Sequence, residues 1–183
     1  MPANLTANLT GDLTGDLAGL PPVAEGLFTW QDGLPHLIGS RCRSCGTLSF
    51  PQQASCPRCC GEDVEQALLP RQGSLWSWTV QRFAPKSPPY AGQETEFQPF
   101  AVGYVALDGG IAVQSRLTGG PGPDASDGLR IGMGVQLVIE PFPRHDGVTV
   151  AAYAFAPLAD GPDPAAASDQ AAAPDPAAAE VPS

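Results

Sequence analysis

The sequence predicts a mainly β protein in which a small four-cysteine ribbon precedes a five-stranded barrel. Three observations predict it. Four of the five cysteines form two Cys-x-x-Cys pairs close together. From Gly73 onward, short segments alternate hydrophobic and polar residues with the period of a β-strand. Both ends of the chain are of low complexity, so a hydrophobic core is expected only between about 21 and 159.

The chain is expected to divide into five segments. Residues 1–20 repeat a tetrapeptide with leucine at every fourth position, among Asn, Asp, Thr and Gly residues that oppose a helix. We interpret this leader as disordered, the alternative being a segment that becomes helical on a partner. Residues 160–183 are mostly Ala, Pro and Asp and predict a disordered acidic tail. Between these ends we expect a helical lead-in over 21–35, a zinc ribbon over 36–66 and the barrel over 67–159.

The lead-in is expected to contain a short helix from Val23 to Gln31 that ends before Gly33. Its large apolar residues, Leu27, Phe28 and Trp30, would pack against the segment that follows.

The cysteine motif predicts a structural metal site. Its ligands are expected to be Cys42, Cys45, Cys56 and Cys59, in the pattern C-x2-C-x10-C-x2-C. Zn²⁺ is the usual ion in a tetrahedron of four thiolates, and a closed shell leaves no position for water or substrate. Iron and a pair of disulfides stay open as alternatives. A ribbon this short cannot close a core, so the metal should supply much of its folding free energy.

The second cysteine pair has an irregularity. Gly46 directly follows the first pair, but Cys60 follows the second and Gly61 comes one residue later. We expect Cys59 to be the ligand and Cys60 to be a spare thiol. The alternative is a C-x3-C pair that ends at Cys60.

The barrel is predicted from five segments with strand periodicity. In the first, Trp76, Trp78 and Val80 are expected on one face and Leu75, Ser77 and Thr79 on the other. Five short strands with irregular loops favour a Greek-key barrel of the OB-fold type over a small β-sandwich. The segments are 73–82, 100–107, 111–117, 133–142 and 148–155.

The charge distribution argues against a nucleic-acid-binding protein. The formal net charge is -10, and every Lys and Arg lies between Arg41 and Arg144. Binding to nucleic acid requires a clustered positive surface. The sequence shows neither a secretory leader nor an apolar stretch long enough to span a membrane, so a cytoplasmic protein is expected.

The order of these motifs resembles the acyl-CoA-associated family in which a rubredoxin-type zinc ribbon is joined directly to an OB-fold. The shared features begin with Trp30, Gly33 and the two cysteine pairs, with Phe50-Pro51 between them. They continue with a Gly-x-x-x-Ser-x-Thr strand from Gly73 to Thr79, then Pro99-Phe100, then Ile131-Gly132 followed by Val135. The resemblance covers about 25–156.

The resemblance implies a non-catalytic accessory subunit of a thiolase-superfamily enzyme. Such enzymes form or cleave carbon–carbon bonds in acyl-CoA substrates, including fatty-acyl and steroid side chains. The OB-fold would dock on the enzyme subunit and help to shape its CoA channel. Three other functions stay open: a nucleic-acid-binding module, an iron-containing electron carrier, and thioester chemistry at Cys60.

The loop from Phe83 to Gln98 is the best candidate for contact with a partner or with CoA, because it is long for a connection between strands. Arg82 precedes it, and it contains Tyr90 and Lys86, the chain's single lysine. The two histidines, His36 and His145, are expected to be surface residues without a catalytic role.

Overall fold

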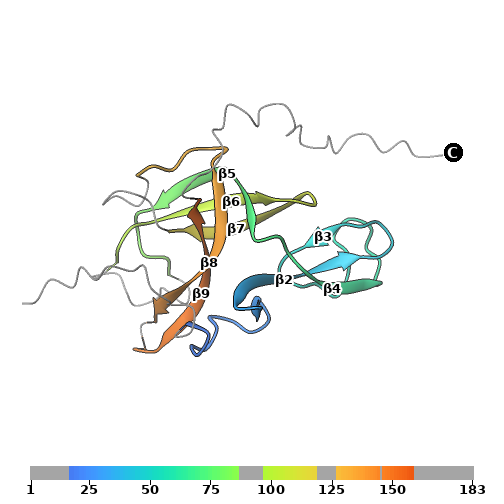
Figure 1. Ribbon diagram of the computed structural model, residues 1–183, viewed down its shortest axis with the longest axis horizontal. Coiled ribbons are helices and arrows are strands. Elements are labelled where there is room, and N and C mark those ends of the chain that lie inside the picture. The colour runs from blue at the N-terminus through green and yellow to red at the C-terminus, as the bar shows by residue number, and fades with distance from the viewer. Residues whose placement is uncertain (1–16, 87–96, 119–126, 145, 159–183) are drawn as a thin grey trace, which may run out of the picture.

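A closed five-stranded barrel with a four-stranded ribbon at its side makes up the protein, seen in a computed structural model (Figure 1). The structure describes residues 17–86, 97–118, 127–144 and 146–158. The expected disordered ends lie largely outside these residues. No helix in the described part is long and apolar enough to cross a membrane.

The barrel has the strand order β5-β6-β7-β9-β8. All five predicted strands are present, with bounds within two residues of those expected, and closure of the barrel excludes the β-sandwich. A three-residue turn joins β6 to β7, and a single short parallel pairing, Arg116–Leu117 with Ala154–Phe155, closes β7 onto β9. The strands are β5 (Gln72–Gln81), β6 (Phe100–Leu107), β7 (Ile111–Leu117), β8 (Gly134–Pro143) and β9 (Thr149–Pro157).

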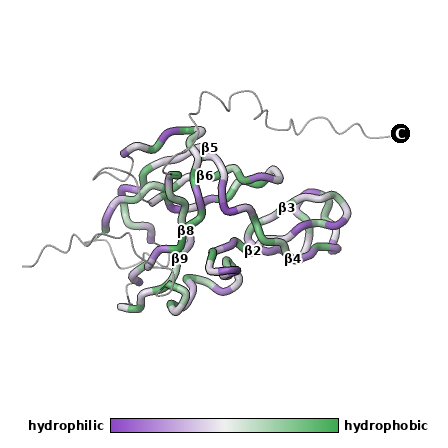
Figure 2. Tube along the Cα trace, in the orientation of Figure 1, coloured by the Kyte–Doolittle hydropathy of each residue, from purple (hydrophilic) through white to green (hydrophobic). Residues whose placement is uncertain are grey.

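Alternate residues of these strands fill the barrel, as the period-two pattern predicts. Phe155, Leu75, Val105, Val135 and Leu137 are at most 1 % exposed. Hydrophobic and hydrophilic residues therefore succeed one another along the strands in Figure 2.

The predicted faces of β5 are wrong because the strand contains a β-bulge at Trp76. A β-bulge shifts the register with β6 between Leu75 and Ser77, so Trp76 has no directly opposed residue. Trp76 is 62 % exposed, whereas Trp78 packs against the core. A bulge inserts one residue, which reverses the alternation beyond it. The two tryptophans therefore do not share a face.

The expected lead-in helix is also wrong. A strand, β1 (Phe28–Gln31), pairs there with β2 (Leu34–Cys42) in an antiparallel hairpin. Its two-residue turn, Asp32-Gly33, has positive φ at both positions, 52° and 74°. Asp-Gly is a strong signal for this type I′ turn, and it outweighs the weak helical spacing of the residues before it.

The ribbon is built around β2. β2 pairs with β3 (Leu48–Ser49) through Ser40 and Arg41, and with β4 (Val64–Leu68) through residues 38–42. Ribbon and barrel share one core, because Leu37 and Leu69 are buried in the same cluster as the barrel residues. A Cβ on Gly109, in the β6–β7 turn, would lie 2.7 Å from Leu48 of the ribbon. The metal motif is thus fixed to one side of the barrel.

Candidate metal centre and the adjacent groove

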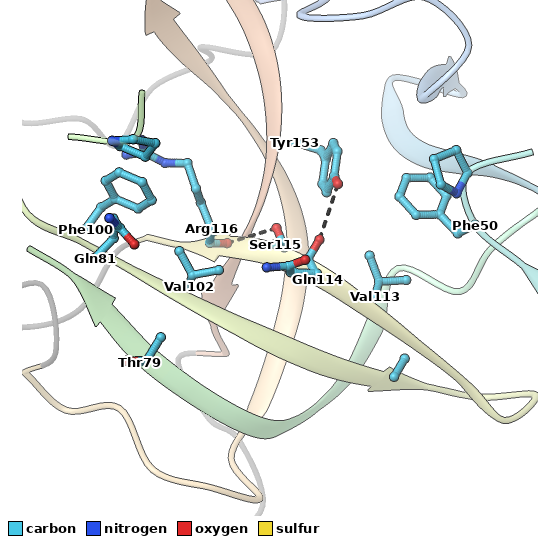
Figure 3. A pocket seen from close by; sticks show the side chains of 13 residues that line it. Phe50, Thr79, Gln81, Phe100, Val102, Val113, Gln114, Ser115, Arg116 and Tyr153 are labelled. Carbon is cyan, nitrogen blue, oxygen red and sulfur yellow. Dashed lines mark hydrogen bonds between the residues drawn. The ribbon is translucent and has the colours of Figure 1, made fainter. Parts of the chain in front are cut away.

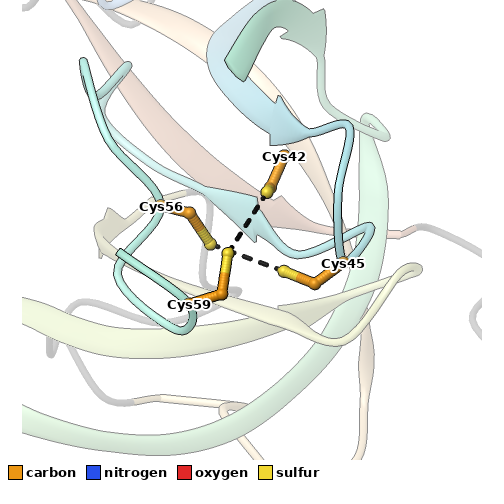
Figure 4. Close-up of side chains that lie close together, drawn as sticks. All are labelled: Cys42, Cys45, Cys56 and Cys59. Atoms are coloured by element: carbon orange, nitrogen blue, oxygen red, sulfur yellow. Dashed lines mark hydrogen bonds between the residues drawn. The ribbon is translucent and has the colours of Figure 1, made fainter. Parts of the chain in front are cut away.

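Four cysteine side chains converge at the tip of the ribbon (Figure 4). Cys42 ends β2 and Cys45 lies in the turn after it, while Cys56 and Cys59 come from the segment between β3 and β4. All four Sγ atoms lie within 4.8 Å of one another. The Sγ atoms of Cys42 and Cys59 are 3.6 Å apart, as are those of Cys45 and Cys56.

These distances fit a tetrahedral ion. With Zn–S bonds of about 2.3 Å, the sulfurs of a tetrahedron lie about 3.8 Å apart. All four positions around such an ion would be filled by protein sulfur, so the centre can hold the ribbon together but offers no position for substrate. Cys60 is exposed and lies outside the cluster.

The two cysteine turns have matching backbone hydrogen bonds. The N–H of Gly46 donates to the carbonyl of Cys42, and the N–H of Cys60 donates to the carbonyl of Cys56, both at 2.9 Å. Gly46 and Cys60 therefore hold equivalent positions, with φ of 73° and 58°. Left-handed φ is favourable for glycine and costs about 1–2 kcal/mol for other residues. Cys60 is therefore a strained residue in a turn suited to glycine.

Replacing Cys60 with glycine is expected to stabilise the protein. The variant Cys60→Gly should raise the free energy of unfolding by about 0.5–1 kcal/mol, because relief of strain exceeds the entropic cost of glycine. Urea unfolding of the metal-replete protein measures the difference. Cys60→Ser is the matched control, since it removes the thiol and keeps the strain. Equal stability of the two variants would contradict this account.

The thiols of the cluster differ in acidity. The Thr47 hydroxyl and backbone N–H lower the pKa of Cys45 to about 6. The backbone N–H groups of Cys59 and Arg58 lower the pKa of Cys56. The N–H of Gly61 favours the thiolate of Cys59, but the three neighbouring sulfurs outweigh it and raise that pKa to about 12. Four such close sulfurs cannot all ionise unless a cation lies between them, and a divalent metal meets that requirement.

Two arginines next to the cysteine motif, Arg43 and Arg58, make different contacts. The Arg43 side chain pairs with carboxylates of the ribbon, Glu65 at 3.0 Å and Asp63 at 3.7 Å. Glu65, as hydrogen-bond acceptor, raises the pKa of Arg43. Arg58 reaches the cluster through its backbone, whose N–H donates to the Cys56 sulfur at 3.4 Å. Backbone N–H groups such as that of Arg58 therefore donate hydrogen bonds that stabilise the thiolates.

A groove of about 550 Å³ runs along β7 between the barrel and the ribbon (Figure 3). One wall is Phe50 of the ribbon with Tyr153 of β9, whose rings meet edge to face at 5.6 Å. At the other end lies Arg116, whose guanidinium carbon is 4.3 Å from the Phe100 ring centroid and whose Nε is 2.9 Å from Glu140. This groove is not predictable from the sequence, because its residues come from five separate segments.

The first residues of the predicted contact loop, 83–86, are described, and one of them, Pro85, lines the groove. Gln81 and Pro85 line the groove, while Arg82 and Lys86 are exposed beside them in the sequence. Tyr90, like His145, lies outside the described residues. His36 pairs with Thr29 across the β1–β2 hairpin.

Two family descriptions match adjacent parts of the chain. Residues 30–65 match the rubredoxin-like zinc ribbon domain of ChsH2, and residues 66–140 match the C-terminal OB-fold domain of ChsH2. The boundary lies within β4.

Several characterised proteins are similar over most of the chain. The benzoylsuccinyl-CoA thiolase subunit BbsA of Thauera aromatica is 33 % identical over 121 residues, which cover 66 % of this chain and 76 % of BbsA. A DUF35 domain-containing scaffold protein of Methanocaldococcus jannaschii is 31 % identical, over 67 % of this chain and 82 % of that protein. Among solved structures, the Ltp2-ChsH2(DUF35) aldolase matches with 27 % identity and a TM-score of 0.45, over 67 % of this chain and 84 % of that one.

Proposed function

The chain belongs to the ChsH2-type family of rubredoxin-like zinc ribbons joined to an OB-fold, and on that premise we propose that it is a non-catalytic accessory subunit of a thiolase-superfamily enzyme. The enzyme would form or cleave a carbon–carbon bond in an acyl-CoA substrate, with fatty-acyl and steroid side chains as candidate substrates. The observation that carries the proposal is the similarity to BbsA, a subunit of an acyl-CoA thiolase, over three quarters of that subunit's length.

In this proposal Zn²⁺ is held by Cys42, Cys45, Cys56 and Cys59. The sulfur spacing and the family of the ribbon both support this metal. The ion would supply structure and no chemistry, since four thiolates close its coordination shell.

The chemistry of the described residues supports a role without catalysis. The clustered thiols are suited to an ion, and Cys60 is an isolated exposed thiol. A cytoplasmic location accords with cysteines that cluster as a metal site, because disulfides are rare in reducing compartments.

The experiment that tests the proposal is purification of the tagged chain from its native host, with identification of the subunit that co-elutes in stoichiometric amount. We expect a thiolase-superfamily protein and carbon–carbon bond activity towards an acyl-CoA in the complex alone. Turnover of acyl-CoA by the isolated chain, or a stoichiometric partner of another class, would overturn the proposal.

Arg82, Lys86 and Tyr90 are proposed to contact the partner or its CoA. Arg82 and Lys86 are exposed and directly follow the groove residues Gln81 and Pro85 in the sequence, which supports this assignment. Arg82→Ala with Lys86→Ala should weaken the complex or its CoA affinity about tenfold, with a larger effect at low salt because exposed charges are screened. Titration calorimetry at two salt concentrations measures both affinities. The control is Arg130→Ala with Arg144→Ala, which removes two cations elsewhere on the barrel. Equal affinities for the two double variants would argue against this contact.

A further inference from the structure

Among the residues that the structure describes, β7 has a backbone edge without a neighbouring strand, and this edge lines the groove. On one side β7 pairs with β6 along its whole length, from Ile111 to Leu117. On the other side it pairs with β9 only at Arg116 and Leu117. Residues 111–115 therefore form a strand edge without a neighbouring strand in the described part of the fold.

The unpaired backbone groups of this edge can be identified. The N–H of Thr118 donates to the carbonyl of Phe155 in β9. The carbonyl of Gln114 accepts a hydrogen bond from the Tyr153 hydroxyl at 3.3 Å. Even-numbered residues therefore direct their backbone groups away from β6, because alternate residues face opposite neighbours. The N–H groups of Ala112 and Gln114 thus point into the groove, and among the described residues they have no backbone partner.

The lining of the groove shows that the edge itself is accessible. Five consecutive residues of β7, from Ala112 to Arg116, line it. The face of a sheet would contribute alternate residues only, whereas an edge contributes consecutive ones. In Figure 3 Gln114 and Arg116 lie along this strand, with Tyr153 above them and Phe50 beyond.

We propose that the β7 edge at Ala112 and Gln114 binds an extended segment of the partner subunit as an additional β-strand. This inference rests on the proposed function and specifies where the partner docks. Strand addition gives affinity through main-chain hydrogen bonds and specificity through the pockets for alternate side chains. An open strand edge is a template for such pairing unless the fold covers it.

The surroundings of the edge define the segment that fits. Phe50 and Tyr153 provide an apolar wall for one side chain. Glu140 lies 2.9 Å from Arg116 and offsets the charge of its guanidinium group. Arg82 and Lys86 are exposed, and in the sequence they directly follow the groove residues Gln81 and Pro85. The segment should therefore be free of proline, with one apolar or aromatic residue and an acidic residue toward that end.

Residues 159–183 fit this description poorly, because prolines interrupt them and each proline lacks the amide donor that a strand requires. Residues 1–16 contain apolar and acidic residues but no aromatic residue to pack against Phe50 and Tyr153. A partner segment is the occupant that the groove's chemistry favours.

The test compares two substitutions at one residue. Gln114→Pro removes the N–H at the edge, and the described part of the fold loses no backbone hydrogen bond. Gln114→Ala removes the side chain and keeps the N–H. With the purified partner subunit as the probe, we expect the proline variant to bind about tenfold or more weakly and the alanine variant to bind within about twofold of the natural protein.

Hydrogen exchange gives a second measurement that does not depend on how well a variant folds. In the full-length natural protein the amides of Ala112 and Gln114 should exchange rapidly, and they should become protected in the complex. Amides of β7 that face β6, such as Val113, should be protected in both states.

Each outcome separates this inference from the proposed function. A partner that binds without protecting these two amides, and equally well to both variants, would disprove strand addition but leave the accessory role intact. Protection in the isolated protein that disappears on deletion of residues 1–16 or 159–183 would identify the chain's own end as the occupant. Protection that rises with protein concentration would identify a second copy. Failure to obtain any thiolase-superfamily partner would overturn both proposals.

Discussion

Removal of the metal is expected to unfold the ribbon. Between Cys42 and Val64 the ribbon has little core of its own, since its buried residues there are two of the proposed ligands, Cys42 and Cys56. Without the ion, no cation offsets the negative charge of the four neighbouring thiolates. The bonds from metal to sulfur that join the two cysteine turns are also lost. Structural zinc contributes about 10–16 kcal/mol of apparent binding free energy in ribbons and fingers of this size. That exceeds the stability of most whole domains, so the ribbon should not survive alone.

Two routes to the metal-free state test this expectation. A strong chelator, and separately Cys42→Ala, should abolish amide protection in β3 and β4 and at the end of β2. The barrel should stay folded with a lowered melting temperature, because Leu37 and Leu69 anchor the ribbon in its core. Cys60→Ala is the matched control and should leave metal content unchanged. A protein that keeps its ribbon amides protected after complete removal of metal would refute a structural role for the ion.

Truncation of Phe155 is expected to be the most damaging single change in the barrel core. Phe155 is fully buried and lies opposite Leu117 of β7 on one side and Leu137 of β8 on the other. The carbonyl of Phe155 also accepts a hydrogen bond from the N–H of Thr118, at the point where β9 pairs with β7 to close the barrel. Phe155→Ala should cost about 3–5 kcal/mol, the sum of lost burial and the cavity that remains.

Urea unfolding of the metal-replete protein measures this loss, and the chain contains a matched control. Phe83 is 82 % exposed, so Phe83→Ala makes the same chemical change without opening a cavity. It should change the free energy of unfolding by no more than about 0.5 kcal/mol. Similar losses in both variants would mean that the barrel does not close through Phe155.

The strands and the cysteine motif were predictable because each is a local pattern. Period-two alternation places the strands of the barrel, and the turn Asp108-Gly109-Gly110 marks its β6–β7 hairpin. The two structural predictions that were wrong concern places where one or two residues change the local backbone geometry. Asp32-Gly33 forms a hairpin turn in place of a helix end, and the bulge at Trp76 reverses the faces of β5. Cys60 follows its cysteine pair where Gly46 follows the first pair, so the sequence already indicated a position suited to glycine, and the structure shows its left-handed φ of 58°.

The sequence by itself determined that this protein has a four-sulfur site and a β-barrel, because both depend on the spacing of residues near one another in the chain. Only the tertiary structure shows the groove and the strand edge on which the proposed partner site rests. The groove joins Phe50, Arg116 and Tyr153 from different elements. In the described part of the fold, β9 pairs with β7 at two residues only and leaves the rest of that edge without a neighbouring strand. Such a site arises from how strands close in space, which no local pattern encodes.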